Sequence, residues 1–135
     1  MSDTYIPAAL RRFVAARAEW RCEYCGIAEA DTWFGCEVDH IVSEKHGGRT
    51  EAENLALACL PCNRHKGSDV ATVREDGTVI ELFHPRRHPW DGHFKAEGLH
   101  LAGRTEVGQA TVRLLRMNLP ERLEERRWSA RQGSD

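Results

Sequence analysis

Two Cys-x-x-Cys motifs constrain this chain more than any other feature of its sequence. The first, CEYC, spans residues 22–25 and the second, CLPC, spans residues 59–62, with 33 residues between them. Four thiolates are the ligand set of a closed tetrahedral zinc site, which has no coordination position left for chemistry. The gap is longer than in a compact zinc ribbon, so a loop or hairpin must lie between the motifs. The predicted ligands of a structural zinc ion are Cys22, Cys25, Cys59 and Cys62.

Two other interpretations of these cysteines are weaker. Four unrelated core thiols would not need to occur as two close pairs, and a thioredoxin-like redox site needs one such motif in a βαβ setting. The N-terminus lacks the basic start and apolar run of a signal peptide. No stretch approaches the ~18–20 continuous apolar residues of a membrane span. We therefore expect a cytoplasmic protein without a membrane span, in which reduced thiols bind metal.

Length and charge limit the classes of function. The 135 residues suffice for one domain with a small core that a metal ion would reinforce. The formal net charge is −2, and residues 1–60 carry 6 Lys and Arg against 10 Asp and Glu. A chain of this kind is not a polybasic nucleic-acid binder, so any basic contact surface must be local.

Helical spacing of Leu10, Phe13 and Val14 predicts a helix over residues 8–20 with these side chains on its apolar face. Later in the chain, residues 84–104 show no clear helical or strand periodicity. The other elements expected are a short helix at 63–67, a hairpin of 70–73 and 79–83 around an Asp-Gly turn, a helix capped by Thr105 and ending near Met117, and a charged helix that Pro120 begins.

A half-buried strand is predicted where Phe34, Cys36 and Val38 alternate with polar residues. Cys36, the one cysteine outside the two motifs, is expected to be a small buried hydrophobe. Asp39 and His40 follow on opposite faces of this strand. Both can serve one site only if the strand ends or distorts there.

Four polar residues between and beside the cysteine pairs suit phosphodiester hydrolysis, which needs an activated water and a Lewis acid. Asp39 and Asn63 offer oxygen ligands of the kind that Mg²⁺ or Mn²⁺ prefers. His40 can take a proton from water near neutral pH, and Asn54 can hydrogen-bond the backbone of the histidine loop. Each residue alone has a commoner explanation, such as a helix cap or a turn. Their occurrence together inside a zinc clamp indicates a catalytic site.

These residues resemble the motif of the HNH endonuclease family. The shared features are the Asp-His pair in VDHIVS, the Gly-Gly loop, Asn-Leu in AENLAL, and CLPCNRHKG, while CEYCG matches the four-cysteine subgroup. The resemblance covers residues 20–69 and implies a ββα-metal fold of the HNH, or His-Me finger, type. It implies that His40 is the general base and that Asn54 orients its loop. It also implies that Asp39 and the last motif residue bind the catalytic divalent ion.

The sequence departs from the family pattern at that last position, where Asn63 replaces the second histidine. Many zinc-clamped members, and the HNH domain of CRISPR effectors, are similar in having asparagine there, so we interpret the chain as an H-N-N variant. His65 is the alternative ligand if the helix register differs. An amide oxygen also binds Mg²⁺ more readily than soft transition metals.

The tail from residue 82 to 127 resembles the C-terminal extension of some small bacterial HNH proteins. Arg86 and Arg87, beside Trp90, are expected to contact the DNA backbone. The alternative is that Trp90 and Phe94 pack this loop across the catalytic unit. Arg64 and Lys66, which follow Asn63, are also candidate DNA contacts.

The sequence thus predicts one α+β domain over residues 1–135. It would contain a ββα-metal core at 20–69 with its zinc site, an N-terminal helix and a C-terminal helical extension at 70–131. The expected function is a DNA endonuclease that uses Mg²⁺ or Mn²⁺ to nick or cut phosphodiester bonds. The alternative is a non-catalytic, zinc-ribbon-like module that binds nucleic acid or protein. Such a module has no need of Asp39, His40 and Asn63 together.

Overall fold

The structure, a computed structural model, describes residues 5–133 and contains helices and three separate two-stranded antiparallel sheets. The N-terminal half contains α1 (Ala8–Arg17), β1 (Cys36–His40), β2 (Leu55–Cys59) and α2 (Leu60–Lys66), with short 3₁₀ turns at Glu29–Asp31, Glu44–His46 and Ala52–Asn54. The C-terminal half contains β3 (Ala71–Val73), β4 (Val79–Glu81), α3 (Trp90–His93), β5 (Phe94–Glu97), β6 (His100–Gly103), α4 (Glu106–Leu114) and α5 (Pro120–Arg131). No helix between residues 5 and 133 has the length and apolar character needed to cross a membrane.

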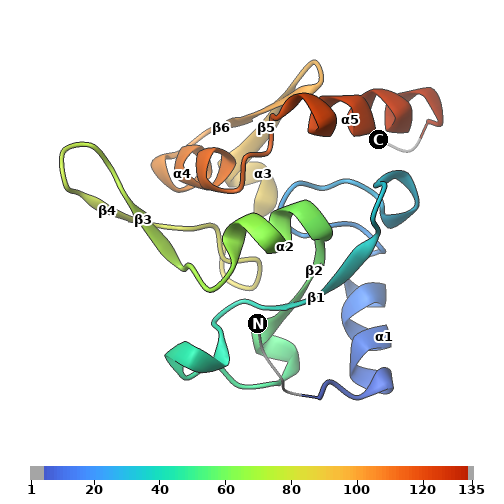
Figure 1. The fold of residues 1–135 in the computed structure, drawn as a ribbon, viewed down its shortest axis with the longest axis vertical. Coiled ribbons are helices and arrows are strands. Elements are labelled where there is room, and N and C mark those ends of the chain that lie inside the picture. The colour runs from blue at the N-terminus through green and yellow to red at the C-terminus, as the bar shows by residue number, and fades with distance from the viewer. Residues whose placement is uncertain (1–4, 134–135) are drawn as a thin grey trace.

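A ββα unit formed by β1, β2 and α2 is the centre of the N-terminal half (Figure 1). Every residue of β2 is buried, because the hairpin is covered on both faces. Leu55 and Leu57 pack with Val14 of α1. The alternate residues Ala56 and Ala58 belong to the larger core cluster, which also contains the four paired cysteines. This is the α+β organisation expected from the sequence.

Three details of the N-terminal expectations are wrong. The helix ends at Arg17, and Phe13 lies on its solvent side with 52% of its surface exposed, where its ring stacks under the Arg17 guanidinium at 5.3 Å. Phe34 precedes the strand and is 70% exposed, because the chain turns at Gly35, which has a φ of 73°. Val14, as expected, and Ala15 are the buried residues of α1.

Several C-terminal expectations are confirmed. The β3–β4 hairpin closes around Asp76–Gly77, with Val73 opposite Val79. Thr105 caps α4, because its hydroxyl oxygen accepts the backbone N–H of Gly108 at 3.0 Å. Residues 84–104, which show no period, contain α3 and the β5–β6 hairpin.

The last helix, α5, begins at Pro120 as expected but has an unusual buried face. Its buried residues are Arg122, Glu125 and Ser129, at the spacing of one helix face. The Thr32 hydroxyl donates to Glu125 at 2.7 Å, and the Ser129 hydroxyl donates to Asp31 at 2.8 Å. Polar contacts thus attach α5 to the segment that follows the first cysteine pair, and Figure 1 shows α5 lying across the end of the molecule distant from α1.

Helix α4 packs against the end of α3 and against β6 at Gly108, where only a glycine fits. A Cβ atom on Gly108 would lie 2.0 Å from the backbone oxygen of His93 and 3.2 Å from the Cα of Gly103. Gly108→Ala should therefore destabilise the domain by about 1–3 kcal/mol, although alanine is usually the better helix former. Denaturant unfolding would measure the change, with Gln109→Ala at the exposed neighbouring position as the control. Equal stability of Gly108→Ala and wild type would contradict this close packing.

Candidate functional site

The four paired cysteines converge in the core. Their sulfur atoms all lie within 4.8 Å of one another, and each residue is at most 4% exposed. The sulfur atoms of Cys25 and Cys59 are 3.7 Å apart, close to the edge of about 3.8 Å in a tetrahedron with Zn–S bonds of about 2.3 Å. A disulfide would need about 2.05 Å. The cluster therefore fits a zinc ion with all four positions filled by protein.

The first cysteine pair forms a tight knuckle. The backbone N–H of Gly26 donates to the carbonyl of Cys22 at 2.9 Å, and Gly26 has a φ of 84° that favours glycine. The N–H of Cys25 also donates to the sulfur of Cys22 at 3.4 Å. Cys36 lies outside the cluster and is half-buried, and burial raises the pKa of its thiol to about 12. It is thus a neutral thiol that packs against the core, although it is less buried than expected.

Asp39 is held by two buried partners. The Tyr24 hydroxyl donates to its Oδ2 atom at 2.9 Å, and the Lys66 ammonium lies 3.2 Å from the same oxygen. Burial raises the pKa of Asp39, and both partners oppose that shift. Burial and the nearby carboxylate also raise the pKa of Tyr24, so the phenol keeps the proton that it donates. The Oδ1 atom of Asp39 has no hydrogen bond with another of the residues that the structure describes.

His40 is the last residue of β1, and it lies where the chain leaves the sheet. Its Nε2 atom is 2.9 Å from the Thr50 hydroxyl, and its backbone carbonyl accepts from Lys66 at 3.3 Å. The side chain is buried, with 7% exposed. The strand thus ends at the Asp39–His40 pair, which is the condition under which both residues can serve one site.

Asn54 closes the loop that follows His40. Its Oδ1 atom accepts the N–H of Val42 at 2.9 Å, and its Nδ2 atom donates to the carbonyls of Val42 and Arg49 at 2.8 and 2.9 Å. The loop passes so close to itself that a Cβ on Gly48 would lie 1.7 Å from the Val42 oxygen. Asn54 therefore fixes the backbone on both sides of the loop.

Helix α2 presents Asn63 and Lys66 to one face of β1. Glu37 and Asp39 alternate along the strand and so share that face. The amide Nδ2 of Asn63 donates to Glu37, while Lys66 contacts Asp39 one helical turn later. His65 is two residues after Asn63 and directly before Lys66, so helical spacing places it on another side of α2. Burial lowers the pKa of His65, and the charges of Arg116 and Arg122 lower it further.

The four candidate DNA-contact residues occupy different environments. Arg64 is exposed on α2. Arg87 is 62% exposed and lies 3.5 Å from Glu81. Arg86 is 15% exposed and pairs with Glu23 in the first knuckle. Lys66 is only 2% exposed, so its charge neutralises Asp39 inside the protein and does not face DNA, contrary to the sequence expectation.

Several contacts of this site were not predicted from the sequence. Tyr24 and Lys66 hold Asp39, Thr50 contacts His40, and Glu37 binds Asn63. Only Glu37 had a signal in the sequence, because it precedes Asp39 by two positions in a strand and therefore shares its face.

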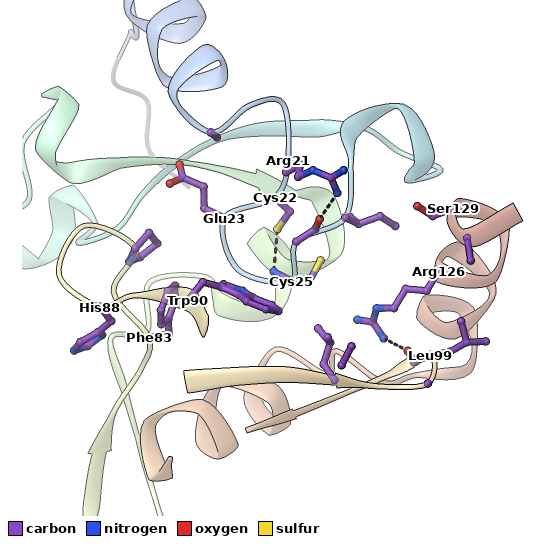
Figure 2. A pocket seen from close by; sticks show the side chains of 18 of the residues that line it. Arg21, Cys22, Glu23, Cys25, Phe83, His88, Trp90, Leu99, Arg126 and Ser129 are labelled. Atoms are coloured by element: carbon purple, nitrogen blue, oxygen red, sulfur yellow. Dashed lines mark hydrogen bonds between the residues drawn. The ribbon is translucent and has the colours of Figure 1, made fainter. Parts of the chain in front are cut away.

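A cavity of about 740 Å³ separates the first knuckle from α5 and the β5–β6 hairpin (Figure 2). Figure 2 shows Cys25 and Trp90 on one side and Arg126 and Leu99 on the other. The Trp90 indole N–H donates to the carbonyl of Tyr24 at 2.8 Å, which packs the extension onto the knuckle. None of Asp39, His40, Asn54 or Asn63 lines this cavity, so it is separate from the candidate active site.

The cluster gives a prediction about zinc. A structural zinc ion contributes roughly 10–16 kcal/mol to folding, as much as the whole stability of an ordinary domain. Wild-type protein should contain about one zinc per chain. Cys22→Ser and Cys59→Ser should lose the metal and unfold, whereas Cys36→Ser, outside the cluster, should keep it. Elemental analysis and circular dichroism measure both properties, and a folded wild type without zinc would contradict the site.

The family model described as HNH endonuclease matches residues 22–69 of this chain. Neither a curated protein nor a solved structure matches it. The matched segment begins at the first cysteine and contains both knuckles, the β1–β2 hairpin and α2, which confirms the ββα fold expected from the sequence. The match does not include α1 or the residues after 69. Residues 22–69 therefore form a domain of the HNH endonuclease family, and the buried four-cysteine cluster fits its zinc-clamped subgroup.

Proposed function

We propose that this protein is a divalent-metal-dependent DNA endonuclease that hydrolyses phosphodiester bonds. The observation that carries the proposal is the end of β1. There an HNH-type Asp-His pair lies against the helix that bears Asn63, within the segment that matches the family. A zinc ion with four thiolate ligands has no open position, so the catalytic ion must be a second metal.

Asp39 and Asn63 are the residues that would hold this second ion. The Oδ2 atom of Asp39 is taken by Tyr24 and Lys66, which leaves Oδ1 for a metal. The Nδ2 atom of Asn63 donates to Glu37, which leaves the amide oxygen for the same purpose. Two oxygen donors with room for water and phosphate suit Mg²⁺ or Mn²⁺. When bound, the ion would stabilise the negative charge that develops on the phosphate and the leaving oxygen.

His40 is the proposed general base. A neutral imidazole can accept the proton of the attacking water, and its contact with Thr50 fixes the ring. Asn54 supports the base indirectly, because it holds the loop that contains Val42 and Arg49. Tyr24 and Lys66 do not react in this scheme. They keep the Asp39 carboxylate in place.

Arg64 and Arg87 are the proposed contacts with DNA phosphates. Both are exposed, and Arg64 directly follows the proposed ligand Asn63. Arg86 is a weaker candidate because its charge is paired with Glu23. The extension is bound to the knuckle through Trp90 and α5, so we propose that residues 1–135 act as one domain.

The test of this function is the cleavage of plasmid DNA by His40→Ala. A positioned general base is worth roughly 10²–10⁴-fold in rate, and we expect a loss of that size with zinc content and DNA affinity unchanged. Wild-type cleavage should require Mg²⁺ or Mn²⁺ and stop with EDTA. It should also fall as the pH is lowered, because burial raises the pKa of Asp39 and a protonated Asp39 cannot bind metal.

Two outcomes would contradict the proposal. Cleavage by a zinc-loaded His40→Ala protein at the wild-type rate would exclude His40 as the base. A wild type that binds DNA but cleaves none with either ion would favour the alternative, a non-catalytic zinc-ribbon-like module.

The ligand assignment is best tested at Asn63. Asp39→Ala would leave Lys66 as an unpaired buried charge, which costs about 3–5 kcal/mol, so loss of activity there would not separate catalysis from folding. Asn63 is half-buried, and Asn63→Ala should remove most of the Mg²⁺-dependent cleavage while the domain stays folded. His65→Ala is the matched control two residues away and should keep activity. The reverse pattern would assign the metal to His65.

A further inference from the structure

A buried cation from the last helix, outside the segment that matches the family, lies against the cysteine cluster. The Nη2 atom of Arg122 lies 3.0 Å from the sulfur of Cys25 and 3.2 Å from that of Cys59. One of these cysteines belongs to the first motif and the other to the second. The residue is 2% exposed, so water does not replace these contacts.

The charge of a loaded cluster explains why a cation is needed there. Four thiolates and one Zn²⁺ leave two uncompensated negative charges, and burying unpaired charge is costly. A guanidinium is always protonated in proteins, and its N–H groups donate well to anions. Arg122 thus supplies both a counter-charge and hydrogen bonds to two of the four sulfur atoms.

A second layer of contacts fixes the guanidinium. Its Nη1 atom lies 3.2 Å from Glu125, one turn along α5. The other carboxylate oxygen of Glu125 accepts from the Thr32 hydroxyl at 2.7 Å and from the backbone N–H of Trp33 at 2.9 Å. Ser129 extends this face to Asp31. The buried polar face of α5 therefore connects the sulfur atoms to the chain just after the first knuckle.

We propose that Arg122 is an outer-shell partner of the zinc centre and that, through it, α5 retains the metal in the HNH domain. Arg122 is a positioning residue, since it would touch the ligands and not the ion. The proposal rests on zinc binding by the cysteines and does not depend on DNA cleavage. The competing explanation is that Arg122 only packs α5 against the core.

The experiment compares zinc retention among full-length variants. Arg122→Met keeps the apolar stem and removes the charge. Outer-shell substitutions typically cost about 10–100-fold in metal affinity, and we expect a loss of that size in competition with a chromogenic zinc chelator. Arg127→Met, on the same helix but 47% exposed, should match wild type. Ser129→Ala should weaken the attachment of α5 to Asp31 without changing zinc affinity.

Site-resolved alkylation gives a second readout, which would not change if Arg122 only packed α5 against the core. Without Arg122, Cys25 and Cys59 should gain reactivity relative to Cys22 and Cys62, because only the first two lose a hydrogen bond. If Arg122→Met does not fold, Arg122→Lys, which keeps the charge beside Glu125, should fold and show a smaller loss of zinc affinity. The proposal would be overturned if whichever of these two variants folds bound zinc with the affinity of the wild type. It would also be overturned if Ser129→Ala lost as much zinc affinity as that variant.

Discussion

The gathering of four buried thiols is the constraint on which the rest of the structure depends. Cys59 ends β2 and Cys62 lies in α2, so a metal bound to both fixes the angle at which the helix leaves the hairpin. That angle places Asn63 and Lys66 against the face of β1 that carries Glu37 and Asp39. The first knuckle adds Tyr24, whose hydroxyl reaches Asp39. The first knuckle, the β1–β2 hairpin and α2 therefore form both the zinc site and the candidate active site, although only the second is proposed to perform chemistry.

Buried charged side chains hold parts of this domain together where a larger domain would rely on apolar packing. Lys66 neutralises Asp39 beneath the candidate active site, and Arg122 lies against two of the sulfur atoms. Removing one partner of such a pair leaves an uncompensated charge, which is usually far more costly than the pair is stabilising. This accounts for a last helix that has no apolar stripe and still packs with Arg122, Glu125 and Ser129 inside. It also makes the positions of Asp39 and Cys25 sensitive to residues distant in the sequence.

Local patterns predicted what depends on neighbours in the chain. The paired cysteines, the Asp-Gly hairpin, the Thr105 cap and the start of α5 at Pro120 all follow from spacing or turn chemistry, and each is present in the structure. The failures involve distant partners. Lys66 was expected to contact DNA, but it is buried, which is rare for lysine, and its partner Asp39 is separated from it in the sequence by the whole loop. The polar face of α5 has no periodic apolar signal, and its partners at residues 31–33 precede it by about ninety positions. The proposed roles of His40, Asn54 and Asn63 are still predictions.

The most direct measurement of the central claim is the location of the second metal. Crystals of the zinc-loaded protein would be grown with Mn²⁺ and measured at the manganese absorption edge. The account predicts a manganese peak between the Oδ1 atom of Asp39 and the amide oxygen of Asn63, in addition to zinc among the four sulfur atoms. Manganese bound at His65, or no manganese at Asp39 in a protein that cleaves DNA with Mn²⁺, would contradict it.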